Sequence, residues 1–337
     1  MFLEKEGKLI YSYDGETVCI EAWGKDALRV RATKNRSFTG RDWALEAKDA
    51  HAGEVEIFED PSAKGGAFAN MYEGTDTSYG KITNGKLHAV IDSGSVITFY
   101  HEDGRVLLKE HFRRLRDEES MPLNIMGREY SNGVGDNFRI VARFVARKGE
   151  KIFGMGQYQQ HELDLKGCML ELAQRNSQVS VPFYLSSIGY GFLWNNPGVG
   201  QVMFANNGTE WVTESGKEID YLVIAGDTPA EIEENYMTLT GKPPMMPEYG
   251  MGFWQCKLRY WNQEQLLSVA RKYKELGVPL DVIVVDFFHW TKQGEFKFDP
   301  KYWPDVPGMC RELKEMGIQV VVSVWPTVDI YSETLRR

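Results

Sequence analysis

The fold is decided by residues 278–324, which read VPLDVIVVDFFHWTKQGEFKFDPKYWPDVPGMCRELKEMGIQVVVSV. Within this stretch, residues 282–285 and 320–324 form short, mostly apolar runs, which are typical of strands covered on both faces of a sheet. Between the runs, apolar side chains recur at helical spacing up to Gly317, namely at Val306, Met309, Cys310, Leu313 and Met316. A strand, a helix and a second strand in this order predict a βαβ unit with parallel strands.

The same alternation of helix and strand extends upstream to residue 250. Residues 250–254 (GMGFW) are predicted to form a strand, and Asn262 is predicted to cap the helix after it. That helix ends at Gly277 and has one apolar face, made by Leu266, Val269, Ala270, Tyr273 and Leu276. Residues 250–324 therefore predict a βαβαβ arrangement around a parallel sheet.

Before residue 225 the sequence has a different character, because short apolar runs alternate with turn residues. Residues 86–91 meet residues 96–100 across Asp92-Ser93-Gly94-Ser95, which indicates a hairpin. Further strands are predicted at residues 17–20, 27–32, 138–145, 181–185 and 191–194. Many short strands joined by such turns predict an antiparallel β-sandwich.

A helix and a proline linker separate the two halves. Thr228-Pro229-Ala230-Glu231 combines an N-cap, a proline at the first helical position and a capping-box glutamate, and the helix is predicted to run to Gly241. Pro243-Pro244 then favours an extended linker. We therefore divide the chain into a β-sandwich at 1–227, a connecting helix and linker at 228–247, and an α/β region at 248–337.

Composition excludes several classes of function. The chain has 337 residues, of which 42% are hydrophobic, and this is enough for two cores. A net charge of -9 without a Lys/Arg cluster argues against nucleic acid as a partner. No apolar run reaches the roughly 18 residues of a membrane-spanning helix, and charges at residues 4–6 disfavour a signal peptide. The four cysteines form no CxxC pair, which predicts reduced thiols and a cytoplasmic protein.

Two glycine-rich stretches and one histidine motif do not match known cofactor sites. Residues 154–159 (GMGQYQ) lack the third glycine of a dinucleotide-binding loop, and residues 133–136 (GVGD) lack a flanking strand and helix. His161-Glu162 lacks the second histidine that a zinc-binding helix needs, and the six histidines are dispersed. We therefore predict neither a cofactor nor a metal.

Polar and aromatic residues follow each strand of the predicted parallel sheet. Asp286 comes directly after residues 282–285 and precedes Phe287-Phe288-His289-Trp290, while Trp325-Pro326 and residues 255–260 (QCKLRY) follow the other two strands. Because functional side chains of such sheets gather at the carboxyl ends of strands, this pattern predicts a shared pocket. A carboxylate among rings suits a sugar, whose hydroxyls it can bind while the rings pack on the apolar face. The alternative is that Asp286 caps a loop turn and the rings pack beneath it.

Several motifs, taken in their order along the chain, resemble glycoside hydrolase family 31, the α-glucosidase and α-xylosidase family. They cover roughly residues 140–337 and are Ile152–Gln157 (IFGMGQ), Gln174-Arg175-Asn176, residues 181–191 (VPFYLSSIGYG), residues 241–247 (GKPPMMP), residues 282–286 (VIVVD) and residues 298–305 (FDPKYWPD). Residues 1–140 resemble the family's N-terminal domain by position and texture only.

The resemblance implies an N-terminal galactose-mutarotase-like β-sandwich followed by the first three βα units of a (β/α)8 TIM barrel. It also implies a retaining α-glycoside hydrolase, of α-xylosidase or α-glucosidase type, that removes terminal non-reducing α-linked sugars. Such enzymes use one aspartate as nucleophile and another as acid and base. The resemblance places both on later barrel strands, so the chain is expected to be a fragment that lacks its catalytic aspartates and is inactive alone.

The resemblance assigns substrate-binding roles to five residues. Asp286, Phe287 and Trp325 would form the sugar pocket, and Arg175 and Asn176 would reach into it from the sandwich. The tryptophan at 325 is more similar to the α-xylosidase branch, whereas the family often has aspartate where Asn176 stands. The implied partner is an oligosaccharide or α-glycoside, without nucleic acid or membrane. A homo-oligomer of the complete protein is left open.

Two other functions remain as alternatives. A non-catalytic carbohydrate-binding protein built on the sandwich would have no use for part of a barrel. A different barrel enzyme, such as an aldolase or isomerase, would need a strand-end lysine or phosphate-binding glycines, and neither is visible. A following strand that ends in a K-x-D sequence would favour the glycosidase, and a stop codon directly after Arg337 would favour the binding protein.

Overall fold

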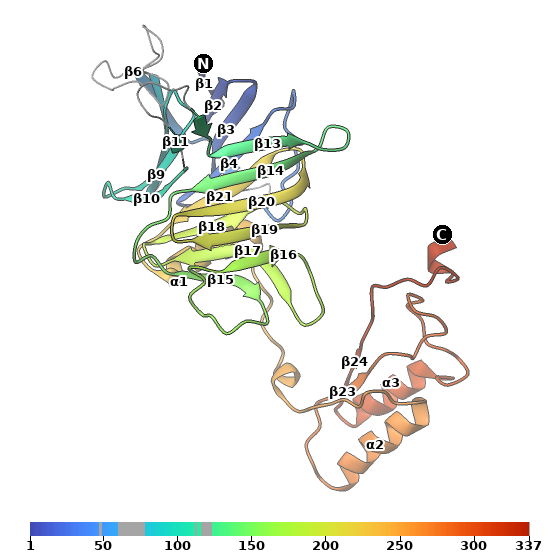
Figure 1. The fold of residues 1–337 in the computed structure, drawn as a ribbon. Coiled ribbons are helices and arrows are strands. Elements are labelled where there is room, and N and C mark those ends of the chain that lie inside the picture. Colours follow the sequence, from blue (N-terminus) through green and yellow to red (C-terminus); the bar gives the residue numbers. More distant parts are fainter. Residues whose placement is uncertain (47–48, 60–77, 112, 116–122, 337) are drawn as a thin grey trace. The chain divides into compact units, whose positions relative to one another are not determined.

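The computed structural model describes residues 1–46, 49–59, 78–111, 113–115 and 123–336. The chain divides into two compact units, Met1–Pro243 and Pro244–Arg337 (Figure 1). Among the helices of the described residues, none combines the length and hydropathy needed to cross a membrane.

The first unit is built from antiparallel sheets. Its largest sheet joins the first strands of the chain to much later ones, because β4 pairs with β21 from Ala27↔Ile224 to Ala32↔Ile219. In the described residues the strands of this sheet are, in spatial order, β1 (Phe2–Lys5), β2 (Lys8–Tyr13), β3 (Glu16–Trp23), β4 (Ala27–Thr33), β21 (Ile219–Ala225), β18 (Tyr190–Trp194), β17 (Val179–Ser186) and β15 (Ile152–Gln157), with β5 (Ala50–His51) beside β3.

Two further sheets of the described residues share one hydrophobic core with the first. One contains β10 (Val106–Lys109), β9 (Ile97–His101), β8 (Leu87–Ile91), β7 (Ser78–Asn84) and β6 (Glu54–Glu59). The other contains β13 (Arg128–Asn132), β14 (Phe138–Phe144), β20 (Gly208–Gly216), β19 (Gly200–Ala205) and β16 (Met169–Leu172). The unit also contains a short antiparallel pair, β11 (Arg113–Leu115) with β12 (Leu123–Ile125). The predicted hairpin across residues 92–95 is confirmed as the β8–β9 pair.

Aromatic side chains fill the space between the sheets. The ring of Phe192 on β18 lies 5.1 Å from that of Trp211 on β20, and Tyr221 on β21 lies 5.4 Å from Phe144 on β14, centroid to centroid. These four rings are fully buried. Because each large ring buries on the order of 150–250 Å² of surface, such contacts dominate the core energy and hold the sheets face to face as a sandwich.

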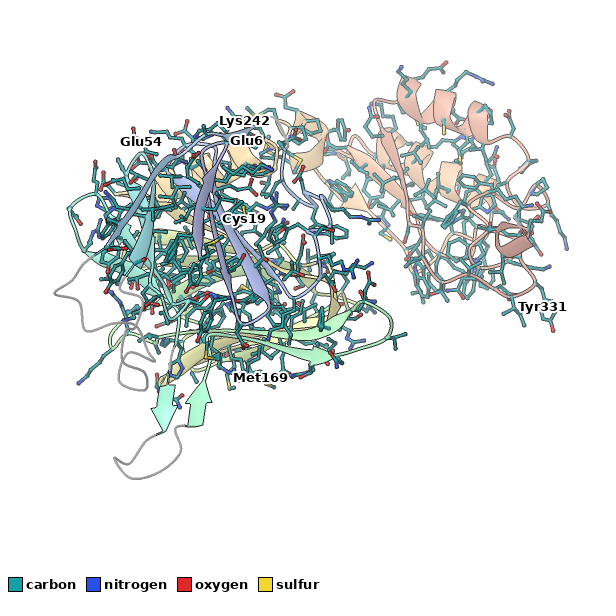
Figure 2. All side chains as sticks on the ribbon, turned by 90° about the horizontal axis from the view of Figure 1, so that it is seen from above. Glu6, Cys19, Glu54, Met169, Lys242 and Tyr331 are labelled. Carbon is teal, nitrogen blue, oxygen red and sulfur yellow. The ribbon has the colours of Figure 1, made fainter. Side chains whose placement is uncertain are left out.

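Cys19 on β3 marks the interior of this unit, as its label among the strands in Figure 2 shows. Its side chain is buried, and this burial raises the pKa of the Cys19 thiol to about 11, with the nearby charge of Glu21 acting in the same direction. All four cysteines are free.

Helix α1 (Pro229–Thr240) packs on the first unit. Its predicted start is confirmed, because the Thr228 hydroxyl accepts a hydrogen bond from the Glu231 amide at 3.2 Å. Its buried residues Ile232 and Leu239 join a core that contains Trp23, Ala27, Leu45, Phe183, Leu193, Leu222 and Ile224. The helix ends at Gly241, whose φ of 98° favours glycine, as the sequence predicts.

The second unit contains the predicted parallel sheet. Strands β22 (Trp254–Gln255), β23 (Val282–Val285) and β24 (Gln319–Val322) pair side by side in parallel, connected by α2 (Gln263–Glu275) and α3 (Val306–Glu315). Both helices begin at side-chain caps: the Asn262 Oδ1 accepts from the Gln265 amide at 2.9 Å, and the Asp305 Oδ1 from the Gly308 amide at 2.8 Å. Single-turn 3₁₀ helices lie at Glu248–Met251 and Thr334–Arg336.

The predicted strand at 250–254 is wrong in its extent. The chain forms a 3₁₀ turn at Glu248–Met251, and only Trp254 and Gln255 pair with β23. Pro247 opens the turn, and its carbonyl accepts the Gly250 amide at 2.9 Å. The Phe253 amide then donates to the Asp281 carboxylate at 2.9 Å, so side-chain bonding replaces ladder pairing there.

Two positions assigned to the apolar helix faces are also exposed. Leu276 follows α2 as its C-cap residue and is 62% exposed, while Cys310 on α3 lies outside the core. The buried residues of α2 are Leu266, Leu267 and Ala270. Each of the two predicted apolar faces therefore contains one residue that is exposed in the structure.

Candidate active site

The carboxyl ends of β22 and β23 bring Asp286 next to Cys256. The Asp286 Oδ1 accepts the amide of Phe287 at 2.8 Å, and the Cys256 Sγ lies 3.8 Å from the Asp286 Oδ2. Partial burial raises the pKa of the Cys256 thiol, and the neighbouring Asp286 charge raises it further, so the thiol stays protonated. Its one S–H has two acceptors within reach, the Asp286 carboxylate and the Lys257 carbonyl oxygen 3.4 Å from Sγ. Asp286 is half-buried, and lone pairs of both oxygens remain open to further donors.

An aromatic wall stands beside this carboxylate. The rings of Phe287 and Trp325 stack with centroids 5.4 Å apart and planes 18° apart, although they follow different strands. Trp290 lies 6.4 Å from Trp325 and is buried, whereas Trp325 is 44% exposed. The strand-end residues Asp286, Phe287 and Trp325 are thus brought together within the second unit.

The loop that carries Asp286 is held by a buried histidine. The Nδ1 of His289 lies 3.0 Å from the Asp286 carbonyl oxygen, and its ring packs 4.8 Å from Phe298. Burial lowers the pKa of His289, so the ring is neutral and its Nδ1–H donates to that carbonyl. The Asp299 amide then donates to the His289 carbonyl at 2.7 Å. The FDPKYWPD motif therefore braces the loop of the candidate site.

Arg259 and Phe288 lie next to this wall, and no role was predicted for either. The Arg259 guanidinium lies 3.5 Å from the Trp261 ring centroid and 5.0 Å from that of Phe288. Phe288 has a φ of 64°, a conformation that costs a bulky residue of order 1 kcal/mol or more. Strand pattern carries no signal for such a turn, so only the structure reveals it.

Arg175 and Asn176 belong to the first unit, on the segment that joins β16 to β17. The Arg175 guanidinium binds the Glu171 carboxylate through two hydrogen bonds of 3.0 Å and 2.5 Å. This pairing raises the pKa of Arg175 and lowers that of Glu171. Both Arg175 and Asn176 are exposed. That they bind the same sugar as Asp286, Phe287 and Trp325 of the second unit stays a prediction.

Cys256 and His289 are the contacts of Asp286 that sequence reasoning did not assign. Cys256 lies in the QCKLRY segment at the end of β22, which pattern alone marked only as polar and aromatic. Within the described ranges, no cluster of three or more His, Cys, Asp or Glu side chains could hold a metal ion. The groups that the structure brings together around Asp286 are the Cys256 thiol and the stacked rings of Phe287 and Trp325.

Comparison with known proteins identifies both units. Residues 17–202 match the glycosyl hydrolase 31 N-terminal galactose mutarotase-like domain, and residues 243–336 match the glycosyl hydrolases family 31 TIM-barrel domain. An uncharacterized family 31 glucosidase of Pseudescherichia vulneris is 42% identical over 98% of this chain and 61% of its own length. An α-xylosidase of Saccharolobus solfataricus is 36% identical over 59% of this chain and 29% of its own length.

Solved structures give the same result. The crystal structure of a family 31 α-xylosidase from a soil metagenome, complexed with xylose, superposes with a TM-score of 0.87 at 44% identity, covering 100% of this chain and 48% of the other. The matched parts thus cover between 29% and 61% of the length of these relatives. The chain belongs to glycoside hydrolase family 31, with the family's galactose mutarotase-like N-terminal domain followed by the start of its TIM-barrel domain.

Proposed function

We propose that the complete protein is a retaining α-glycoside hydrolase that removes terminal α-linked sugars, with α-xylosides preferred over α-glucosides. The observation that carries the proposal is the grouping of Asp286, Phe287 and Trp325 at adjacent strand ends. Family membership and the α-xylosidases among the relatives support it. The relative solved with xylose supports a sugar ligand of this class.

In this proposal Asp286 binds sugar hydroxyls rather than attacking the anomeric carbon. One of its oxygens already accepts the Phe287 amide and the other faces the Cys256 thiol, which fixes the carboxylate plane. A fixed carboxylate with open lone pairs suits two neighbouring hydroxyls, and charge-assisted hydrogen bonds of this kind contribute about 1.5–3 kcal/mol each.

Phe287 and Trp325 would form the wall against which the sugar ring packs. Stacking between the two rings holds the indole in one orientation, and 44% of the Trp325 side chain remains exposed for a sugar to cover. A xylosyl unit lacks the hydroxymethyl group of a glucosyl unit, so a bulky tryptophan at this position favours the smaller sugar. Arg175 and Asn176 are proposed to bind the same sugar, with Glu171 orienting the guanidinium.

We propose that the two catalytic aspartates lie on barrel strands that follow β24. The proposal rests on the family's retaining mechanism, in which a nucleophile forms a glycosyl-enzyme intermediate and a second carboxyl group protonates the leaving oxygen. Residues 228–247 are proposed to connect the two domains, and the four free cysteines support action in the cytoplasm.

Turnover of 4-nitrophenyl α-xyloside and 4-nitrophenyl α-glucoside tests the proposal. The 337-residue chain should release no nitrophenol, and the complete gene product should hydrolyse the xyloside faster, with retention of configuration by NMR. Trp325→Ala in the complete protein should raise kcat/KM for the glucoside relative to the xyloside. Sugar binding without hydrolysis by the complete protein would instead favour a carbohydrate-binding function, and inversion would exclude the retaining mechanism.

A further inference from the structure

A cavity of about 720 Å³ lies on the first unit, at the end of the sandwich where β4 and β20 meet the segments beyond them. Its wall includes Arg36, Arg41 and Trp43 from the segment after β4, Asn137 from the β13–β14 turn, and Asn196 from the segment after β18. The volume falls in the range of roughly 300–1,000 Å³ that is usual for small-molecule sites. Every lining residue belongs to the first unit, so the cavity is complete within it.

A buried ion network fixes the segment that forms the wall. Arg29 on β4 is fully buried and binds both oxygens of Asp220 on β21, at 2.9 Å and 2.7 Å. The same guanidinium donates to the Asp42 carboxylate at 2.7 Å and to the Arg41 carbonyl at 2.9 Å. Asn195 adds a hydrogen bond to the Asp42 carbonyl at 3.1 Å. The backbone on both sides of the cavity wall is therefore anchored to the sheet.

The second end of the wall is anchored by a buried carboxylate. Glu218 accepts the Thr39 amide and the Thr39 hydroxyl, both at 2.8 Å, and the Asn35 side chain donates to the Lys217 carbonyl at 3.2 Å. Lys217 in turn pairs with Asp136 at 2.7 Å. The Glu218 carboxylate is therefore held by Thr39, and Lys217 and Asp136 neutralise each other.

Between these anchors, Trp43 is presented to solvent in a strained conformation. Its φ is 54°, and its side chain is 45% exposed. A bulky residue in the left-handed region persists only where the surrounding structure imposes it, and such residues cluster at functional sites. Here the anchored neighbours Asp42 and Ala44 impose it, because the Ala44 amide donates to the Asn195 Oδ1 at 3.3 Å.

Two arginines next to this ring have donors to spare. The Arg41 guanidinium lies 5.2 Å from the Trp43 ring centroid and covers one side of the indole. In the described part of the chain, no carboxylate pairs with the side chain of Arg41 or Arg36. An indole with an open side, two unpaired guanidinium groups and nearby amides match the apolar face and the hydroxyls of a pyranose ring.

We propose that this cavity is a second, non-catalytic carbohydrate site that binds a neutral α-linked oligosaccharide. One pyranose ring stacks on Trp43, and its hydroxyls accept hydrogen bonds from Arg36 and Arg41. The proposal does not depend on hydrolysis, because the site is complete within the sandwich unit. It would give the protein a separate attachment point for the glycan on which it acts.

Calorimetric titration of the 337-residue chain with maltotriose, isomaltotriose and α-1,6-xylosyl-glucose tests the proposal. Binding of at least one of them is expected, and Trp43→Ala should weaken it by about tenfold or more. Phe58→Ala, which removes an exposed ring elsewhere on the first unit, should leave it unchanged. Asp286→Ala should also leave it unchanged, which separates this site from the one proposed on the second unit.

A double Arg36→Gln and Arg41→Gln variant provides the second test, because it removes the charges and leaves the Arg41 carbonyl that Arg29 binds. It should weaken the same titration even if Trp43→Ala proves unstable by circular dichroism. Three results would overturn the proposal: no binding of any of the three sugars, unchanged binding in both variants, or binding of glucuronate alone.

Discussion

The indole of Trp325 lies almost parallel to the ring of Phe287, with centroids 5.4 Å apart and an angle of 18° between their planes. Phe287 follows β23 and Trp325 follows β24, so the parallel register of these strands, from Val282↔Gln319 to Val285↔Val322, makes the contact possible. Since Asp286 immediately precedes Phe287, the stacked rings of Phe287 and Trp325 form the aromatic wall next to the Asp286 carboxylate. Changes at any of these positions should therefore affect substrate more than stability.

Asp286→Ala in the complete protein should lower kcat/KM for 4-nitrophenyl α-xyloside by on the order of 10²-fold or more, because it removes one or two charge-assisted hydrogen bonds to substrate. The melting temperature should barely change, since this half-buried carboxylate supports only a local turn. Asp329→Ala is a matched control, because Asp329 likewise accepts one backbone amide nearby, that of Tyr331 at 2.7 Å. Normal kinetics with a lowered melting temperature would make Asp286 a structural cap.

Cys256 should become more reactive when Asp286 is neutralised. The Asp286 charge helps to raise the pKa of the Cys256 thiol, so less of the nucleophilic thiolate is present at a given pH. In Asp286→Asn, iodoacetamide at pH 8 should therefore alkylate Cys256 faster, as followed by peptide mass spectrometry. The exposed Cys310 serves as the internal reference and should keep its rate. Equal rates at Cys256 in both proteins would show that the two side chains do not interact.

The second unit should lose stability as the pH falls below about 6.5, the ordinary pKa of histidine. Burial lowers the pKa of His289 in the folded state, so the unfolded chain binds the proton more tightly. The contribution of neutral His289 to the free energy of unfolding is therefore complete above the pKa of histidine in the unfolded chain. It is lost as the pH falls through the lower pKa of His289 in the folded state. Urea unfolding followed by tryptophan fluorescence at pH 7.5 and 5.0 measures this change.

His289→Gln should reduce the loss between these two pH values, because the titrating group is gone. His161→Gln, at an exposed position of the first unit, should keep the full loss. If the unchanged protein and both variants showed the same loss of stability, the pH dependence would come from groups other than His289.

Gly156→Ala should destabilise the first unit by roughly 3 kcal/mol or more. Gly156 on β15 has a φ of 90°, and a Cβ there would lie 2.2 Å from the Val179 carbonyl oxygen. Gly149→Ala is the matched control, since its φ is 82° but a Cβ would meet nothing within 4 Å. That variant should lose only about 1 kcal/mol from backbone strain. Chemical denaturation measures both, and similar losses would show that the close contact relaxes at little cost.

Local signals made the second unit largely predictable. The cap at Asn262 and the glycines after α2 and α3 act over one turn of helix, so local sequence is enough to place the start of α2 and the ends of both helices. The cap at Asp305 was seen only in the structure. The prediction of a strand at 250–254 was wrong because the local conformation depends on Asp281. This residue is distant in sequence, and its carboxylate accepts a hydrogen bond from the Phe253 amide. Strand order alone also predicts that Asp286, Phe287 and Trp325 lie at one edge, and the structure brings them together there. Their role in binding sugar stays a prediction.

The first unit shows what the sequence could not provide. Short strands and turns predict a sandwich, but nothing local predicts that β4 pairs with β21 or that Arg29 binds Asp220 between them. The same holds for the wall of the cavity beside Trp43, since its conformation follows from that long-range network. The structure also explains the IFGMGQ motif: Gly154 and Gly156 flank a register shift in β15, where the backbone approaches β17 too closely for a side chain.

The pairing of β4 with β21 has a consequence for synthesis on the ribosome. Residues 27–32 are synthesised before their partners, residues 219–224, and cannot pair until these have been made. At a synthesis rate of about 5–20 residues per second, this delay is on the order of 10–40 s. During that time the apolar edge of β4 is unpaired and Arg29 lacks its buried partner Asp220. The nascent chain thus exposes a strand open to wrong pairing, so slower elongation or a shortage of chaperones should reduce the yield of folded protein.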